Sequence, residues 1–257
     1  MTRPEPPVRG LRVAASFLTR VPLHRDGEID IAVSTPWFPV VGLLIGLAGG
    51  GVFALASEVL TPAVSAALAL VVTALITGAF HQDGLADIAD AFGGGWDREQ
   101  RLAILKDSRH GTYGVMALVL STAVQLSALA SMTAAWGLAA LVAAHTLARS
   151  AVLGVLLTAR PARPEGLGAD YATGLRRGVV VAGAGVGLGV TSLVLGLWAA
   201  LAVAAVGLTS IAVVVLAHRK IGGISGDVLG ATEQVAEGAV LVVVAGVAHA
   251  GHLPWWR

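Results

Sequence analysis

Long, uninterrupted apolar blocks restrict what this chain can fold into more than any other feature. Windows of about 20 residues with few charges lie at 37–57, 63–80, 115–132, 136–157, 179–196, 197–217 and 235–251. A helix of about 20 residues crosses about 30 Å of hydrocarbon, whereas the strands of a membrane barrel are shorter and alternate in polarity. The sequence therefore predicts an all-α fold: a polytopic transmembrane helical bundle of about seven spans, forming a single integral-membrane domain over 1–257.

The composition agrees with this fold class. Of the 257 residues, 56% are hydrophobic and only 13% are charged, too few to cover a soluble protein of this size. The chain has no cysteine, which excludes disulfides, thiolate metal sites and a cysteine nucleophile. The polar, proline-containing stretch at 2–7 is not typical of a cleavable signal peptide.

Basic residues indicate the orientation. Apart from Arg149 and Arg257, every Lys and Arg lies in the N-terminal segment or in the loops 81–114, 158–178 and 218–234. By the positive-inside rule these segments face the cytoplasm, in a multi-pass protein of the cytoplasmic membrane. The segment Val8–Leu18 is too short to span; it either lies along the cytoplasmic surface as an interfacial helix or packs on the bundle.

Two features inside the apolar windows concern helix packing. Small-residue spacing predicts close helix approach at Gly42, Gly46 and Gly50 and at Gly185 and Gly189. His145 and Arg149 are four residues apart in one window and must face the bundle interior or a wet cavity. We interpret them as a structural hydrogen-bonded pair in preference to ligand contacts.

An acidic stripe follows the second window. Asp83, Asp87 and Asp90 are spaced i, i+4 and i+7, so a helix presents all three on one face. Three like charges there favour a hard divalent ion such as Mg²⁺, which takes oxygen ligands and bridges carboxylates to phosphates. A solvated helix end is the alternative, disfavoured because the stripe directly continues an apolar span. His81 projects from the opposite side and is expected to be a hydrogen-bonding helix histidine.

Two further loops carry polar clusters. Asp97 is expected to cap a short helix through Lys106, and the glycine-flanked turn that follows holds Lys106, Arg109 and His110. This turn either binds phosphate or serves only as a topology signal. In the last loop, Ser225 and Asp227 follow a glycine turn, and Glu233 and Glu237 start the seventh span. These acids are metal ligands, a site for a substrate hydroxyl, or a capped helix start.

Three motifs together resemble a known family. They are His81-x-Asp83-Gly-Leu-Ala-Asp87-x-Ala-Asp90-x-x-Gly-Gly-Gly, Lys106-Asp-Ser-Arg109-x-Gly-Thr-Tyr113-Gly and Gly222-Gly-x-Ser225-Gly-Asp227-x-Leu-Gly-Ala-x-x-Glu233. The chain is similar, from about residue 17 to 237, to the membrane-embedded cobalamin synthases, the adenosylcobinamide-GDP ribazoletransferases. One departure is Gln82, where many members are expected to have an acid, so Gln82 is left out of the ligand set.

The resemblance implies a Mg²⁺-dependent transferase. The hydroxyl of α-ribazole, or of its 5′-phosphate, would attack adenosylcobinamide-GDP, giving adenosylcobalamin or its phosphate and releasing GMP. The metal ligands would be Asp83, Asp87, Asp90 and Asp227, with Asp90 as an alternative general base. Lys106 and Arg109 would hold phosphate oxygens in the reaction. Substrate contacts would also come from Tyr113, Ser225, Asp227 and Glu233.

Two other functions compete with this one. CDP-alcohol phosphotransferases also place aspartates on helices at the cytoplasmic face, but in one compact motif that this chain lacks. A divalent-cation transporter would place its acids near the bilayer midplane, whereas these acids cluster in the connections. The expected partners are the two small-molecule substrates and the lipid bilayer, with no nucleic acid, and a homo-oligomer remains compatible with the sequence.

Overall fold

The computed structural model describes residues 7–23, 31–163 and 177–256. Three basic residues counted in the orientation argument, Arg3, Arg25 and Arg176, lie outside these ranges, as does the C-terminal Arg257.

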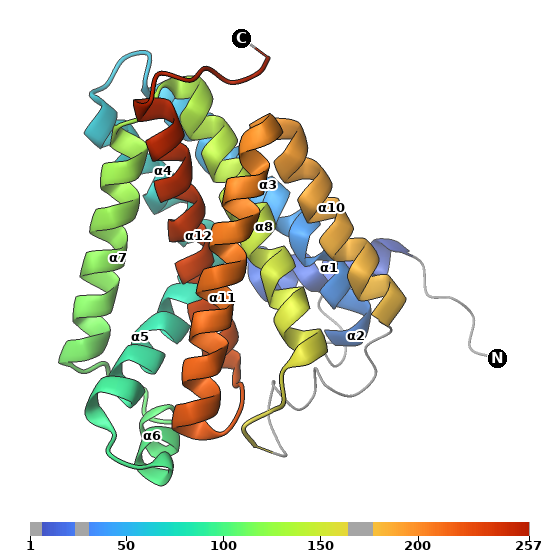
Figure 1. Cartoon of the computed structure of the whole chain (residues 1–257), viewed down its shortest axis with the longest axis vertical. Coiled ribbons are helices and arrows are strands. Elements are labelled where there is room, and N and C mark those ends of the chain that lie inside the picture. Colours follow the sequence, from blue (N-terminus) through green and yellow to red (C-terminus); the bar gives the residue numbers. More distant parts are fainter. Residues whose placement is uncertain (1–6, 24–30, 164–176, 257) are drawn as a thin grey trace.

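Helices make up almost all of the described chain (Figure 1). They are α1 (Pro7–Leu18), α2 (Ile31–Ser34), η1 (Thr35–Trp37), α3 (Phe38–Ala56), α4 (Pro62–Thr77), α5 (Phe80–Gly94), α6 (Arg98–Ile104), α7 (Thr112–Ala130), α8 (Ala134–Thr158), α10 (Arg177–Leu195), η2 (Gly196–Trp198), α11 (Ala199–Ile221) and α12 (Gly226–His249). Extended pairing in the described residues is limited to an isolated bridge between Pro161 and Ile224. The predicted all-α class is confirmed.

The number of spans is consistent with the predicted seven. Five helical stretches are long and apolar enough to cross a membrane, and the bent pair α4–α5 adds a sixth, whose apolar part is α4. One of the five, Arg177–Ile221, has 45 residues, about twice what a bilayer needs. It folds back at Gly196, which has a φ of +57°, and thereby provides two antiparallel helices, α10 and α11 (Figure 1).

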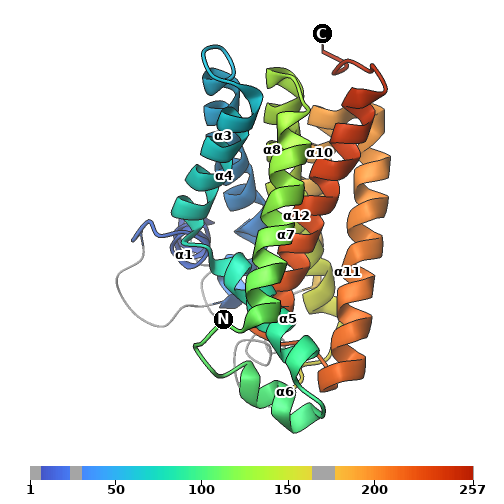
Figure 2. The ribbon, with the colours of Figure 1, turned by 90° about the vertical axis from the view of Figure 1, so that its left-hand side faces the viewer.

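The long helices stand side by side, with α8 in the centre (Figures 1 and 2). In its most apolar window 83% of α8 is buried, against 22% for α7, so α7 presents most of its surface to the membrane. Helices α5 and α6 lie together at the end of the bundle opposite the C-terminus, and we call this the α5/α6 end. His145 and Arg149 of α8 face the bundle interior, as predicted.

Close packing of α3 on α8 depends on the predicted glycines. A Cβ atom at Gly42 or Gly46 would lie 2.3 Å or 2.6 Å from a backbone oxygen of α8, which leaves no room for a side chain. The second predicted pair, Gly185 and Gly189, is wrong, because a Cβ there would meet no described atom within 4 Å. The close approach of α10 instead uses Gly183 and Gly187, two residues earlier on the opposite side of the helix.

A sharp bend separates α4 from α5. Gly78 and Ala79 both adopt left-handed backbone conformations, with φ of 66° and 57°, and the two helices meet at 91°. The sequence analysis predicts that the acidic stripe directly continues the second span, and this prediction is wrong. The stripe lies on a separate helix beyond the bend. Ala79 has a Cβ, so this conformation is strained and must be held by its surroundings.

The first helix packs on the bundle. Val13, Ala14 and Leu18 of α1 are almost completely buried, and Ala14 and Leu18 belong to the same apolar cluster as Phe38 of α3 and Leu153 of α8. Of the two alternatives for this segment, the structure therefore favours a helix packed on the bundle.

Arginines predicted only as topology signals tie the α5/α6 end together. Arg98 donates to the backbone oxygens of Ile221 (2.9 Å) and Ala162 (2.8 Å), and Arg163 donates to that of Leu102. These carbonyls include the unpaired C-terminal groups of helices, which need partners outside their own helix. The predicted cap is also confirmed, since Asp97 accepts from the Gln100 amide at 2.9 Å; α6 ends at Ile104, before Lys106.

Candidate active site

Two aspartates of α5 face a histidine from the next loop. The imidazole of His110 lies between Asp83 and Asp87, with Nε2 3.4 Å from Asp83 Oδ1 and Nδ1 3.6 Å from Asp87 Oδ1. One ligand atom from each residue falls within 4.8 Å of the others, the arrangement of a cation site. The i, i+4 spacing on one helix brings the two carboxylates together, whereas His110 is positioned by the turn before α7.

A third carboxylate adds to this negative charge. Asp227, in the first turn of α12, lies near the pair because α5 and α12 approach closely: a Cβ at Gly84 would be 3.0 Å from the Asp227 backbone oxygen. Burial, followed by the charges of Asp83 and Asp227, raises the pKa of Asp87 to about 6. Asp83 and Asp87, with Asp227 close enough for its charge to act on Asp87, offer the oxygen donors that Mg²⁺ prefers.

A cavity of about 490 Å³ adjoins the acidic pair. Its wall combines the α4–α5 bend, Asp83 and His110 with the C-terminal part of α1 and the residues that follow it, including Arg20. The guanidinium of Arg20 lies against Gly78, where a Cβ would be 2.0 Å from Arg20 Nε. The bend thus leaves room for a cation beside the acidic pair, and sequence reasoning did not assign Arg20 to the site.

The third residue of the stripe, Asp90, is placed differently. It is 7% exposed, and its two carboxylate oxygens accept from the backbone amides of Gly111 (2.6 Å) and Gly114 (2.8 Å). These amides belong to the start of α7, where backbone N–H groups have no partner within the helix. The structure therefore does not join Asp90 to the cluster of Asp83, Asp87 and His110, since both of its oxygens hold α7 against α5.

Replacing Asp90 by Ala should lower the free energy of unfolding by about 2 kcal/mol, because two charge-assisted hydrogen bonds at a helix start are lost. Thermal unfolding in detergent without Mg²⁺ measures this effect. The exposed cap variant Asp97→Ala is the matched control and should cost about 1 kcal/mol or less. A metal ligand would behave in the opposite way: Asp90→Ala would leave the metal-free protein as stable as wild type and weaken only Mg²⁺ binding.

The predicted phosphate-binding residues lie on the exposed loop between α6 and α7. Arg109 pairs with Asp107 (Nη2 to Oδ2, 2.6 Å), and these hydrogen bonds lower the pKa of Asp107 to about 2. Lys106 is exposed, and the ring of Tyr113 packs over Gly93 at the end of α5. The structure thus keeps these side chains beside the acidic cluster without bringing them into it.

The last predicted residues divide between the site and the interior. Ser225 caps α12, accepting from the Val228 amide and donating to Asp227 Oδ2 at 3.2 Å, so a capped helix start and a carboxylate near the acidic pair occur together. Glu233, two turns further along α12, is fully buried. It does not line the cavity beside Asp83 and His110.

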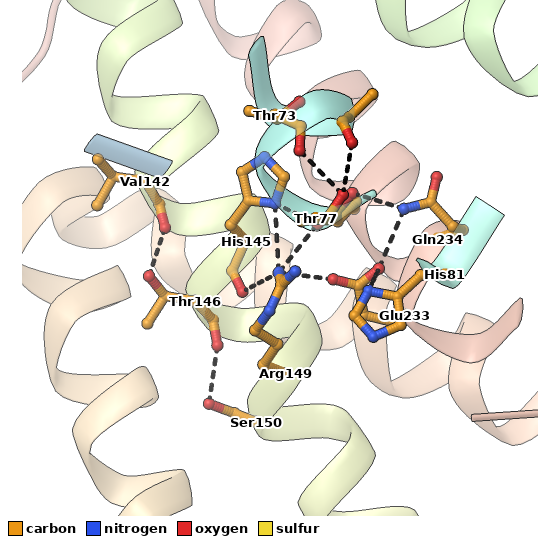
Figure 3. Close-up of polar contacts among 12 residues, drawn as sticks. Thr73, Thr77, His81, Val142, His145, Thr146, Arg149, Ser150, Glu233 and Gln234 are labelled. Carbon is orange, nitrogen blue, oxygen red and sulfur yellow. Dashed lines mark hydrogen bonds and ion pairs between the residues drawn. The ribbon is translucent and has the colours of Figure 1, made fainter. Parts of the chain in front are cut away.

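Glu233 belongs to a polar network inside the bundle (Figure 3). Arg149 Nη1 lies 2.6 Å from Glu233 Oε1 and 3.1 Å from Glu237 Oε1, and His81 Nδ1 lies 3.1 Å from Glu233 Oε2. Gln234 donates to both glutamates, and His145 contacts Glu237. His81 is thus a hydrogen-bonding histidine, as predicted.

Arg149 is the cation that offsets the buried carboxylates of this network, although its Nε and Glu233 Oε1 have no hydrogen-bond partner among the described residues. His145, Glu233 and Glu237 also have ligand atoms within 4.8 Å of one another, but the guanidinium of Arg149 already contacts all three residues. A buried carboxylate is stable only when it is paired and hydrogen-bonded. The network therefore fixes α8, α12 and α5 behind the acidic cluster.

Comparisons with known proteins give one consistent family. The sequence profile of the cobalamin-5-phosphate synthases matches residues 10–245. An adenosylcobinamide-GDP ribazoletransferase of Bradyrhizobium diazoefficiens is 47% identical over 93% of this chain and 94% of its own length. Proteins of the same name from Ralstonia nicotianae (39% identity, 92% and 94% coverage) and Mesorhizobium japonicum (41%, 88% and 89%) are also similar. No solved structure matches significantly.

Proposed function

Because this chain belongs to the cobalamin-5-phosphate synthase family, enzymes of cobalamin synthesis, we propose that it joins α-ribazole or its 5′-phosphate to adenosylcobinamide-GDP. The ribazole hydroxyl forms a new bond to the phosphorus that carries cobinamide, and the bond from that phosphorus to GMP breaks. The hydroxyl proton leaves to a base, and GMP departs as the free nucleotide. The observation that carries this assignment is the cluster of Asp83, Asp87 and His110 beside an open cavity.

Mg²⁺ fits the residues present. Asp83 and Asp87 would hold the ion, with Asp227 as a further oxygen donor. When bound, the ion would offset the charge of these acids and of the substrate diphosphate. Imidazole is a poor ligand for Mg²⁺ compared with oxygen donors, so we assign His110 to the substrate side of the cluster, where it would hold or accept the hydroxyl proton.

Cations around the cavity would position the diphosphate. Arg20 lies in the cavity wall, and Lys106 and Arg109 lie on the loop that carries His110. Phosphoryl transfer requires from the protein mainly positioning and charge stabilisation, which these side chains supply. Asp90 would act indirectly, by fixing the start of α7 and with it His110.

GMP release tests the proposal. Protein in liposomes, incubated with adenosylcobinamide-GDP, α-ribazole and Mg²⁺, should release GMP only when all three are present, because a site built to position an alcohol excludes water. Release without ribazole would indicate a hydrolase. Turnover of a CDP-linked lipid with no GMP release would move the chain to the CDP-alcohol phosphotransferases, and Mg²⁺ uptake without chemistry would indicate a transporter.

We also propose that the α5/α6 end faces the cytoplasm. The basic segment that holds α5 and α6, residues 159–163 after α8 and the loop after α11 lie at this end (Figures 1 and 2), which supports the orientation through the positive-inside rule. A reporter active only outside the cytoplasm should give a signal when fused after Arg257, and none when inserted within 158–178. The reverse result would overturn this orientation and place the site outside.

A further inference from the structure

A second cavity, of about 280 Å³, lies deeper in the bundle. Its wall is formed by α4, α7, α8 and α12, together with Gln82 of α5. Gln82 also lines the cavity beside Asp83 and His110. One side chain thus forms part of both walls, so the deeper cavity adjoins the acidic cluster.

Most of the deeper wall is apolar. Leu70 and Val71 of α4 face Leu126 of α7, and Leu141 and Leu241 complete the lining from α8 and α12. Such a wall suits a flat apolar group, because burying apolar surface favours binding in proportion to the area removed from water. The volume is sufficient for a small bicyclic group.

One polar side chain in this wall lacks a partner. Gln125 of α7 is 7% exposed and lines the cavity, and its amide nitrogen has no hydrogen-bond partner among the described residues. At membrane depth an unpaired amide is costly. Among the other polar lining groups, His145, Gln234 and Glu237 are engaged in the Arg149 network. A hydrogen-bond acceptor on a ligand would pair with the Gln125 amide, which would thereby select for ligands that carry such an acceptor.

We propose that this cavity binds the base of the nucleoside substrate, so that the sugar reaches past Gln82 toward the acidic cluster. This inference rests on the proposed function and specifies how its acceptor is recognised. The base of α-ribazole is a methylated benzimidazole, which is largely apolar and has one free ring nitrogen. The leucine and valine side chains contact the ring faces and methyl groups, and the Gln125 amide donates to the ring nitrogen.

Equilibrium dialysis of α-ribazole against the full-length protein in detergent tests the hydrogen bond. Gln125→Leu keeps the volume and removes the donor, so the Kd for α-ribazole should rise about 10-fold. Val124→Leu, on the same helix at a position 48% exposed, should leave it unchanged. Gln125→Leu removes an unpaired buried group, so its thermal stability should equal or exceed that of wild type. An unchanged Kd would overturn the role of Gln125.

Filling the cavity tests the location independently. Leu126→Trp should weaken α-ribazole binding at least 10-fold, whereas the neighbouring Val124→Trp, which points to the membrane, should not. Neither variant should change the Kd for adenosylcobinamide-GDP, which also shows that Leu126→Trp is folded. Equal affinity for α-ribazole in both Trp variants would overturn the proposal. The cavity would then be a site for a lipid chain and not for the base.

The base itself supplies a test without any variant. The benzimidazole riboside that lacks both methyl groups should bind wild type about 15-fold more weakly, since each of the two buried methyls contributes about 4-fold. Equal affinity would contradict an apolar pocket for the base. If the wild-type protein releases no GMP, the proposed function is wrong. If it releases GMP, but the variants bind α-ribazole as tightly as wild type and the analogue binds as tightly as α-ribazole, only this inference is wrong.

Discussion

Replacing Asp87 by Asn is expected to lower kcat by more than about 100-fold while the protein stays folded. Loss of a group that only supports a metal ligand already costs about 10–100-fold in affinity or activity, and Asp87 is placed to be a ligand itself. Its carboxylate is partly buried between Asp83 and Asp227, whose charges oppose its ionisation. A neutral Asn relieves that repulsion, so the metal-free variant should unfold at the same temperature as wild type or higher.

A Mg²⁺ titration of GMP release makes this result specific. The Asp87→Asn variant should need a much higher Mg²⁺ concentration for its residual activity. Asp97→Asn, which retains the helix cap on α6, should show the wild-type titration curve. Near wild-type turnover by Asp87→Asn at limiting Mg²⁺ would remove Asp87 from the metal site.

Replacing Arg149 by Met should be the most destabilising single change in the chain, costing about 3–5 kcal/mol, because it leaves buried carboxylates without a cation. Arg149 is 1% exposed and contacts both Glu233 and Glu237. We expect little folded protein in the membrane fraction and a strongly lowered unfolding temperature in detergent.

Removing the acids together with the cation should restore much of this loss. In the triple variant Arg149→Met, Glu233→Gln, Glu237→Gln, the network has no unpaired charge and keeps hydrogen-bonding groups of similar size. Replacement of a complete buried ion network is often neutral for stability, in contrast to removal of one partner. If Arg149→Met alone is as stable as wild type, the ion network does not hold α8 to α12.

The spans were predictable because the bilayer imposes a length and a polarity on every crossing helix. The alignment of Asp83 with Asp87 was also predictable, since it depends only on the helical repeat. Burial of His145 and Arg149 followed from their place inside an apolar window. In each case the determining physics is local to a short stretch of sequence.

What the sequence did not reveal depends on contacts between distant segments. Asp90 shares the stripe with Asp83, but α7 packs against α5 at this point, so that Asp90 accepts hydrogen bonds from backbone amides of α7. Arg149 lies in one apolar window and Glu233 just before another, and only packing of α8 on α12 identifies them as partners. The Gly183 and Gly187 contact was missed because several glycines in that window have the same spacing, and the neighbouring helix decides which face is used.

The short length of α4 has a consequence for the lipid around the site. Its 16 residues rise about 24 Å, about 6 Å less than a typical hydrocarbon layer. Such hydrophobic mismatch is relieved by local thinning of the bilayer, at a cost of a fraction of a kcal/mol per Å. Such thinning would bring the headgroup layer closer to the start of α5, so that a large amphiphilic molecule could present its phosphates to Asp83 without leaving the membrane surface.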